Sequence, residues 1–199
     1  LKETSGLTAL MCAANKNATD AVKVLVDAGA AKDVQDRNGL SALMLAIRGK
    51  AREAAKMLAD EGGCKDLEEQ TGRTALMMVV ADSTETVKAL VDAGADKDLQ
   101  DEMGMTALMF AAVTNDPEAL KVLIDAGAAK DHQNVDEITA LMLAVILEAK
   151  EAVQVLVDAG ADKDLQDKCG TTALMHAVQN DDNEVVKVLV DAGTAKYLQ

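Results

Sequence analysis

The sequence predicts an all-α solenoid of six stacked helix-turn-helix repeats with projecting β-turn or hairpin connectors, and three observations predict it. The motif Thr-Ala-Leu-Met, once Ser-Ala-Leu-Met, recurs at spacings of 33, 33, 32, 33 and 33 residues. A glycine follows each motif start by 21 residues, or by 20 in the third repeat. Apolar residues make up 49% of the chain but aromatic residues only 1%. A core of small aliphatic and methionine side chains suits thin, closely stacked helices.

The first helix of each repeat begins directly after the threonine or serine of the motif. A hydroxyl side chain is a good N-cap because it accepts a hydrogen bond from an orphan backbone N–H. The apolar stretch that follows Thr8, Ala-Leu-Met-x-Ala, predicts a short helix. The same arrangement follows Ser41, Thr74, Thr106, Thr139 and Thr172.

The second helix of each repeat carries apolar residues at helical spacing, such as Val185, Val186, Leu189 and Val190 in the last repeat. Gly29 and its equivalents suit the position after a helix, where a positive φ costs glycine little. In the fourth repeat, Asp116 and Pro117 predict an N-cap followed by proline at the first helical position.

The connector between repeats is polar and ends in glycine, as at 96–104, which predicts a projecting turn or hairpin. We therefore expect one domain, 1–199, with repeats at about 1–35, 36–68, 69–100, 101–133, 134–166 and 167–199. The residue missing from the third repeat is expected in the turn near Asp82 and Ser83.

The 33-residue unit resembles the ankyrin repeat over essentially the whole chain. Residues 8–14, Thr-Ala-Leu-Met-Cys-Ala-Ala, are similar to the family's Thr-Pro-Leu-His-x-Ala-Ala. Residues 24–30 resemble its Val-x-Leu-Leu-x-x-Gly-Ala, and Gly6-Leu7-Thr8 resembles its Gly-x-Thr entry. The resemblance implies a non-catalytic scaffold or adaptor that binds a partner protein on its concave face.

Three departures from the family pattern are consistent. Alanine replaces proline at the helix start, and methionine replaces histidine at six equivalent positions, where we expect it to fill the site as an adaptable apolar side chain. A connector position that is usually apolar in the family holds lysine, whose stem should pack while its ammonium reaches water. These residues are Lys32, Lys65, Lys97, Lys130, Lys163 and Lys196.

The fifth repeat is the least regular. Glu137 stands where the other five repeats have glycine. Its inter-helix turn, 146–149, contains no Gly, Asn or Asp. Either this turn is strained, or the fifth repeat has an altered conformation that serves a function.

No set of residues predicts catalysis, a metal site or a cofactor. His132 lies in a connector, and His176 is interpreted as a polar substitution facing the end of the stack. Cys12 is interpreted as a small core residue, whereas Cys64 and Cys169 lie in connectors without a histidine partner. The aspartates of the connectors do not have the spacing of an EF-hand calcium loop.

The charge balance of 20 basic against 34 acidic residues gives −14, which disfavours nucleic acids and anionic membranes as partners. No apolar run is long enough for membrane insertion. Three widely spaced cysteines do not suggest a disulfide framework, so we expect an intracellular, cytoplasmic protein.

The resemblance places partner contacts on the connector tips and on the inner face of the first helices. Arginine is enriched at interface hot spots, and three of the four arginines map there: Arg37, Arg48 and Arg73. The fourth and fifth repeats place apolar residues there: Met103, Met105, Val113, Val135, Ile138, Ile146 and Leu147. Exposed apolar patches commonly mark contacts, so we expect a groove with an arginine-bearing end for an acidic group and an apolar centre.

Two alternatives stay open beside the scaffold or adaptor. The similarity of the repeats favours an engineered or consensus-derived scaffold, whereas the short third and irregular fifth repeats argue against one. The chain can also be a peripheral subunit of a large complex, or an accessory domain of a longer and possibly catalytic protein. The fold analogy supports binding as a role but names no partner.

Overall fold

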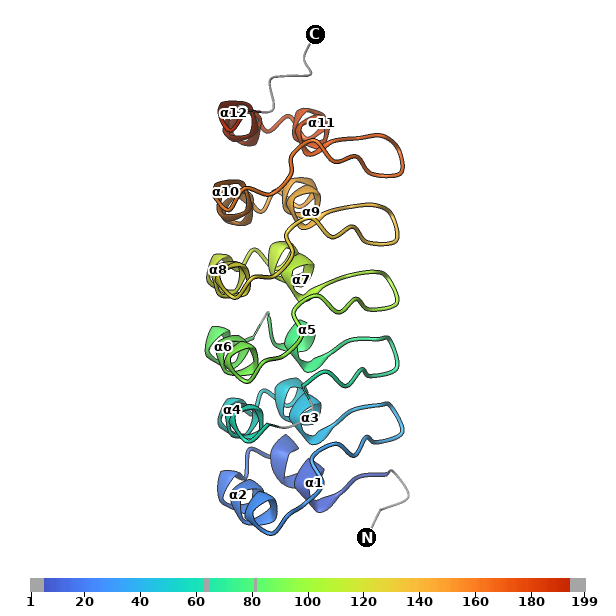
Figure 1. Ribbon diagram of the computed structural model, residues 1–199, viewed down its shortest axis with the longest axis vertical. Coiled ribbons are helices and arrows are strands. Elements are labelled where there is room, and N and C mark those ends of the chain that lie inside the picture. Colours follow the sequence, from blue (N-terminus) through green and yellow to red (C-terminus); the bar gives the residue numbers. More distant parts are fainter. Residues whose placement is uncertain (1–5, 63–64, 81, 194–199) are drawn as a thin grey trace. The chain divides into compact units, whose positions relative to one another are not determined.

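The structure, a computed structural model, describes residues 6–62, 65–80 and 82–193 (Figure 1). Within these residues the chain forms twelve α-helices, and the only β-pairing is an isolated bridge between Glu68 and Thr74. The all-α prediction is confirmed. The helices belong to two compact units, Leu1–Glu102 and Met103–Gln199.

Unit 1 contains three helix pairs whose equivalent helices pack on one another. The first helices pack in the order α1, α3, α5 and the second helices in the order α2, α4, α6. The first helix of each pair lies between the second helix and the projecting connector (Figure 1). The helices are α1 (Ala9–Asn15), α2 (Thr19–Asp27), α3 (Ala42–Arg48), α4 (Arg52–Asp60), α5 (Ala75–Val79) and α6 (Thr84–Asp92).

Unit 2 repeats this arrangement with three further pairs. Helix α9 packs against α7 and α11, and α10 packs against α8 and α12. The helices are α7 (Ala107–Val113), α8 (Pro117–Asp125), α9 (Ala140–Ile146), α10 (Lys150–Asp158), α11 (Ala173–Gln179) and α12 (Asn183–Asp191).

The predicted N-caps of the first helices are confirmed. Each capping hydroxyl accepts a hydrogen bond from the backbone N–H of the methionine three residues later, at 3.2–3.4 Å. Asp116 caps α8 through Glu118 N and Ala119 N, and Pro117 is the first helical residue. These bonds satisfy N–H groups that have no partner within their own helix.

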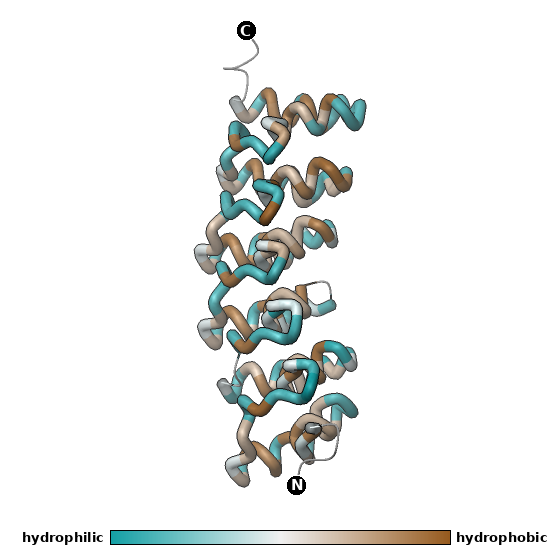
Figure 2. Tube along the Cα trace, turned by 90° about the vertical axis from the view of Figure 1, so that its right-hand side faces the viewer, coloured by the Kyte–Doolittle hydropathy of each residue, from teal (hydrophilic) through white to brown (hydrophobic). Residues whose placement is uncertain are grey.

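The methionines that replace the family's histidine are core residues in five of the six repeats. Met11, Met44, Met77, Met109 and Met142 are at most 4% exposed. Met175, in the last repeat, is 50% exposed. Apolar residues concentrate in the helices, whereas the connectors are mostly hydrophilic (Figure 2).

Three connectors fold as tight turns that are each held by a polar side chain of the turn itself. The Oδ1 atom of Asp36 accepts the N–H groups of Asn38 and Leu40, and Asn134 and Asp167 make the equivalent bonds. Backbone bonds link consecutive connectors, such as Gln70 N to Asn38 O at 3.2 Å in unit 1. These connectors therefore form an ordered row within each unit.

The connector lysines are half-buried, as predicted for packed stems with solvated ends. Lys32 Nζ donates to the carbonyl of Glu61, at the end of α4 in the next repeat. Of the six predicted positions, Lys196 lies outside the described residues.

Both irregularities noted in the sequence are visible in the backbone. Helix α5 has five residues where the other first helices have seven, and Ser83 already caps α6, so the deletion lies between α5 and α6 as predicted. Glu148 has φ 56°, close to 53° at Asn17 and 51° at Asn115 in equivalent turns. The fifth turn is therefore not bent differently, but it forces a glutamate into a left-handed conformation that favours Asn or Gly.

Candidate partner-binding surfaces

Unit 1 contains a groove of about 650 Å³ between the inner face of α1 and α3 and the connector turns. Its charged residues are Lys16 and Arg48, at the ends of these helices, and Asp36 on the connector. The Oδ1 atom of Asp36 is engaged by two backbone N–H groups. The groove thus has two exposed cations at its helix end that suit an acidic group.

The predicted arginines differ in their surroundings. Arg48 lines the groove, and Arg37 is exposed on the connector turn. Arg73 is half exposed and its Nε lies 3.6 Å from Oδ2 of the buried Asp101. The structure therefore joins Arg48 with Lys16, a residue that the sequence prediction did not include.

Unit 2 presents the predicted apolar residues in two rows. On the connector turns, Val135 N donates to Met103 O at 3.0 Å, which holds these residues side by side. Met103 is 57% exposed and Val135 is 42% exposed. The backbone bond therefore places two exposed apolar side chains on adjacent connector turns.

The second row lies where the inner helices end. Val113 is the last residue of α7 and is 38% exposed, and Leu147 caps the C-terminal end of α9 and is 50% exposed. Met105, Ile138 and Ile146 are half-buried. We call the exposed residues Met103, Val113, Val135 and Leu147 the apolar surface of unit 2.

Two residues with reactive side chains, a cysteine and a histidine, have surroundings that differ from the sequence prediction. Cys12 was expected in the core but is exposed and lines the groove of unit 1, because the inner face of α1 is turned to solvent there. His176 was expected to face the end of the stack, but its Nε2 lies 3.0 Å from Oδ2 of Asp167 in the connector of its own repeat. The exposed residue beside it is Met175.

The described part of the chain holds no group of three potential metal-ligating side chains. Within the same residues, no helix has the length and apolar character needed to cross a membrane. Cys64, which was assigned to a connector, lies outside the described residues.

One set of hydrogen bonds between repeats was not predicted from the sequence. Helices α4 and α10 begin after Ala51 and Ala149, which have no capping side chain. The cap comes from the preceding repeat: Asn17 Oδ1 accepts from Ala54 N at 3.1 Å, and Asn115 Oδ1 accepts from Ala152 N at 3.0 Å. An asparagine in the inter-helix turn, 37 residues before a helix that starts after alanine, is the signal that could have revealed them.

These asparagines also set the electrostatics of the neighbouring carboxylates. The side-chain amide of Asn17 donates to Glu53 at 2.6 Å and lowers the pKa of that carboxyl below its usual value. Asn115 donates to Glu151 at 2.7 Å and lowers its pKa in the same way. The pKa of Asp167 is lowered mainly by the backbone N–H of Thr171 and further by His176. Hydrogen bonds to the charged form of each carboxyl account for these directions.

Comparison with known proteins agrees with the geometry. A family model described as ankyrin repeats (3 copies) matches residues 1–68, 61–134 and 113–199. The structure is similar to that of an ankyrin repeat domain from Acinetobacter baumannii AYE, with 30% identity, a TM-score of 0.86, and coverage of 92% of this chain and 97% of that one. It is also similar to EF0377, an ankyrin repeat protein, with 30% identity, a TM-score of 0.85 and coverage of 92% and 96%. No curated protein matches the chain.

Proposed function

Because this chain belongs to the ankyrin repeat family, we propose that it is a non-catalytic scaffold that binds a partner protein through the inner surfaces of its repeats. Ankyrin repeats mediate protein–protein interactions, and the fold is typically a non-catalytic interaction module.

One observation carries the proposal. Among the described residues, seven large apolar side chains are exposed, and four of them form the apolar surface of unit 2. The other three are Val24, Met175 and Val178. Removing exposed apolar area from water is favourable by about 25 cal/mol per Å² before the costs of association are subtracted, and exposed apolar side chains commonly mark contact sites. The surface therefore suits apolar side chains of a partner protein.

The groove of unit 1 supports recognition of a different chemical group. Arg48 and Lys16 lie at its helix end, and guanidinium groups bind carboxylates in a bidentate geometry. The chain as a whole carries −14, so this cationic end is a local exception on an acidic protein. We propose that it binds an acidic side chain of the partner.

The test is quantitative capture of proteins from the source cell with the native chain and two variants as bait. Val135→Asp combined with Leu147→Asp disrupts the apolar surface of unit 2. Val178→Asp is the matched control, because Val178 is 62% exposed and lies outside that surface. We expect a partner that is retained by the native chain and the control and lost by the double variant.

The groove of unit 1 is tested with the same partner. Arg48→Glu should weaken binding about tenfold at low salt and less at high salt, because the charge is solvent-exposed. Lys56→Glu, an equal charge reversal on the exposed side of α4, should leave binding unchanged. Equal retention of every partner by all these variants would refute the assignment of both surfaces.

We also propose an intracellular location. Cys12 and Cys169 are free and exposed, and exposed free thiols persist most readily in a reducing compartment. Fluorescence imaging of the tagged chain in its own cell checks this, and a secreted or surface pool would contradict it.

A further inference from the structure

Two glutamates of the fifth repeat border the apolar surface of unit 2. Glu137 follows Val135 by two residues on the same connector turn. Glu148 directly follows Leu147, the residue that caps the C-terminal end of α9. Both glutamates are exposed. The surface therefore has one carboxylate on its connector side and another on the side where the inner helix ends.

Both glutamates occupy backbone conformations that suit other residue types better. Glu137 has φ 60°, whereas the equivalent residue in each of the other five repeats is glycine. Glu148 has φ 56° in the inter-helix turn. This left-handed region has a steric cost for a residue with a Cβ atom, and asparagine and aspartate reduce that cost more readily than glutamate. The fifth repeat thus carries two strained residues.

Neither glutamate side chain has a partner within the described part of the chain. In equivalent inter-helix turns, Asn115 caps the helix of the next repeat at 3.0 Å, and Lys50 Nζ lies 3.6 Å from Oδ1 of Asp82. Over the residues that the structure describes, the carboxylates of Glu137 and Glu148 make no hydrogen bond or ion pair. Contacts within the chain therefore do not offset the strain at these two positions.

The surroundings of the two carboxylates favour a cationic ligand. Helices α7 and α9 contain no charged residue. On the connector turns, Lys168 Nζ already lies 3.9 Å from Oδ1 of Asp136. Residues 103–199 hold 7 basic against 16 acidic residues, which gives −9, and none of the basic residues is arginine. A cationic group is therefore attracted to this side of the surface, and an anionic group is repelled.

Given the proposed binding of a partner protein to this surface, we propose that the bound segment carries apolar side chains bordered by lysine or arginine. Its apolar side chains contact the apolar surface of unit 2, and its cations pair with Glu137 and Glu148. Burial of the apolar part removes water from around the carboxylates, which strengthens their attraction to the cations. Backbone strain is thus retained at two positions where the partner supplies a charge to bind.

Selection of a random phage-displayed peptide library against the full chain, at about 0.15 M salt, tests this specificity. The recovered peptides should combine apolar residues with neighbouring lysine or arginine more often than the unselected library does. Recovered peptides that are apolar but have no excess of lysine or arginine would overturn the inference and leave the proposed function standing.

Fluorescence anisotropy of a recovered peptide then measures the contribution of the two carboxylates. Glu137→Gln combined with Glu148→Gln should weaken binding about tenfold, because two exposed ion pairs are lost. Glu118→Gln combined with Asp125→Asn is the matched control, since it removes the same charge from exposed positions on α8, and it should change the affinity less than about twofold. Equal losses in both variants would indicate general attraction to an acidic protein and overturn the inference. An unchanged affinity in the first variant would also overturn it.

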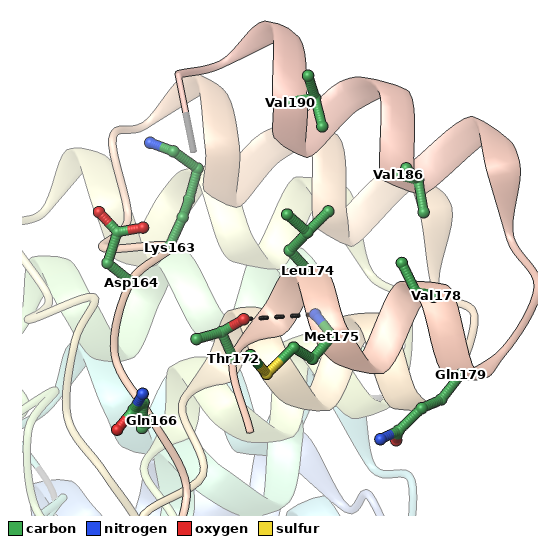
Figure 3. A pocket seen from close by; sticks show the side chains of 10 residues that line it. All are labelled: Lys163, Asp164, Gln166, Thr172, Leu174, Met175, Val178, Gln179, Val186 and Val190. Atoms are coloured by element: carbon green, nitrogen blue, oxygen red, sulfur yellow. Dashed lines mark hydrogen bonds between the residues drawn. The ribbon is translucent and has the colours of Figure 1, made fainter. Parts of the chain in front are cut away.

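Uncharged substitutions separate this inference from the proposed function. Val135→Ser combined with Leu147→Ser should weaken peptide binding at least about tenfold without adding a charge. Val178→Ser is the control, because Val178 lines a different hollow together with Val186 and Val190 (Figure 3). Peptide binding that survived the double serine variant would refute both the inference and the function proposed for this surface.

Glu137→Gly gives a readout that a purely structural role would not give. The substitution relieves the left-handed strain and should stabilise the fold, yet it should lower peptide affinity about threefold because one ion pair is lost. Stability and affinity that changed in the same direction would overturn the role assigned to Glu137.

Discussion

Replacing Asn115 by glycine tests whether one repeat holds the next through a helix cap. Asn115 Oδ1 accepts from Ala152 N at 3.0 Å, in a helix whose own N-cap is Ala149. Glycine removes the acceptor but tolerates the φ of 51° at this position, so the substitution isolates the cap from backbone strain.

The expected magnitude follows from these two facts. Loss of a capping side chain costs about 1 kcal/mol in the free energy of unfolding. Asn115→Ala should cost about 2 kcal/mol, because alanine in the left-handed region adds about 1 kcal/mol of strain. The bond to Glu151 is solvent-exposed and adds little.

Urea denaturation followed by circular dichroism measures both variants. Asp181→Gly is the matched control, because Asp181 has φ 56° in the equivalent turn and no described helix follows for it to cap. In dilute protein this control should change stability by less than about 0.5 kcal/mol. As a second readout, the pKa of Glu151 should rise in Asn115→Gly, since the Asn115 amide is the largest cause of its lowering. If Asn115→Gly matched the control and left that pKa unchanged, the cap between repeats would be refuted.

Three further outcomes are expected. Glu137→Gly should stabilise the chain by about 1 kcal/mol in thermal or urea unfolding, because Glu137 has φ 60° where the other repeats have glycine; a loss of stability would show that its side chain has a compensating contact. Gly104→Ala should destabilise by about 2–3 kcal/mol in the same assay, because φ is 73° and an added Cβ would lie 2.8 Å from Val135 N; an unchanged midpoint would contradict the close contact. Stability should also fall as the pH drops from about 5 to 3. The folded-state pKa values of Glu53, Glu151 and Asp167 lie below their unfolded values, so their contribution is present above the unfolded pKa and is lost as pH falls through the folded one. Urea titrations at several pH values check this prediction. A free energy of unfolding that rose steadily towards pH 3 would contradict it.

Much of the fold could be predicted because its signals are local. Thr139 predicts the start of α9 from its hydroxyl alone, since the bond to Met142 N spans three residues. The deletion between α5 and α6 was located by comparing marker spacings, which need no knowledge of contacts. The apolar surface of unit 2 was predicted from equivalent positions in the repeat, and its residues Met103 and Leu147 are exposed in the structure.

Exposure and contacts between repeats could not be predicted from a single repeat. Cys12 occupies a position that is apolar in the next repeats, and only the turned-out inner face of α1 shows that it is exposed. Met142 and Met175 occupy the same motif position, but one is 1% and the other 50% exposed, because a following helix pair covers only the first. The asparagine caps likewise join residues 37 positions apart.

The sequence by itself therefore determined the helices, their caps, the turns and the repeat period, because each depends on side chains within a few residues of one another. Only the tertiary structure decided which helix faces are covered and which cations line the groove of unit 1. It also decided which helices are capped by a side chain of the preceding repeat. Burial and hydrogen bonding between repeats depend on the neighbour that each surface meets, and identical motifs differ in this respect along the chain.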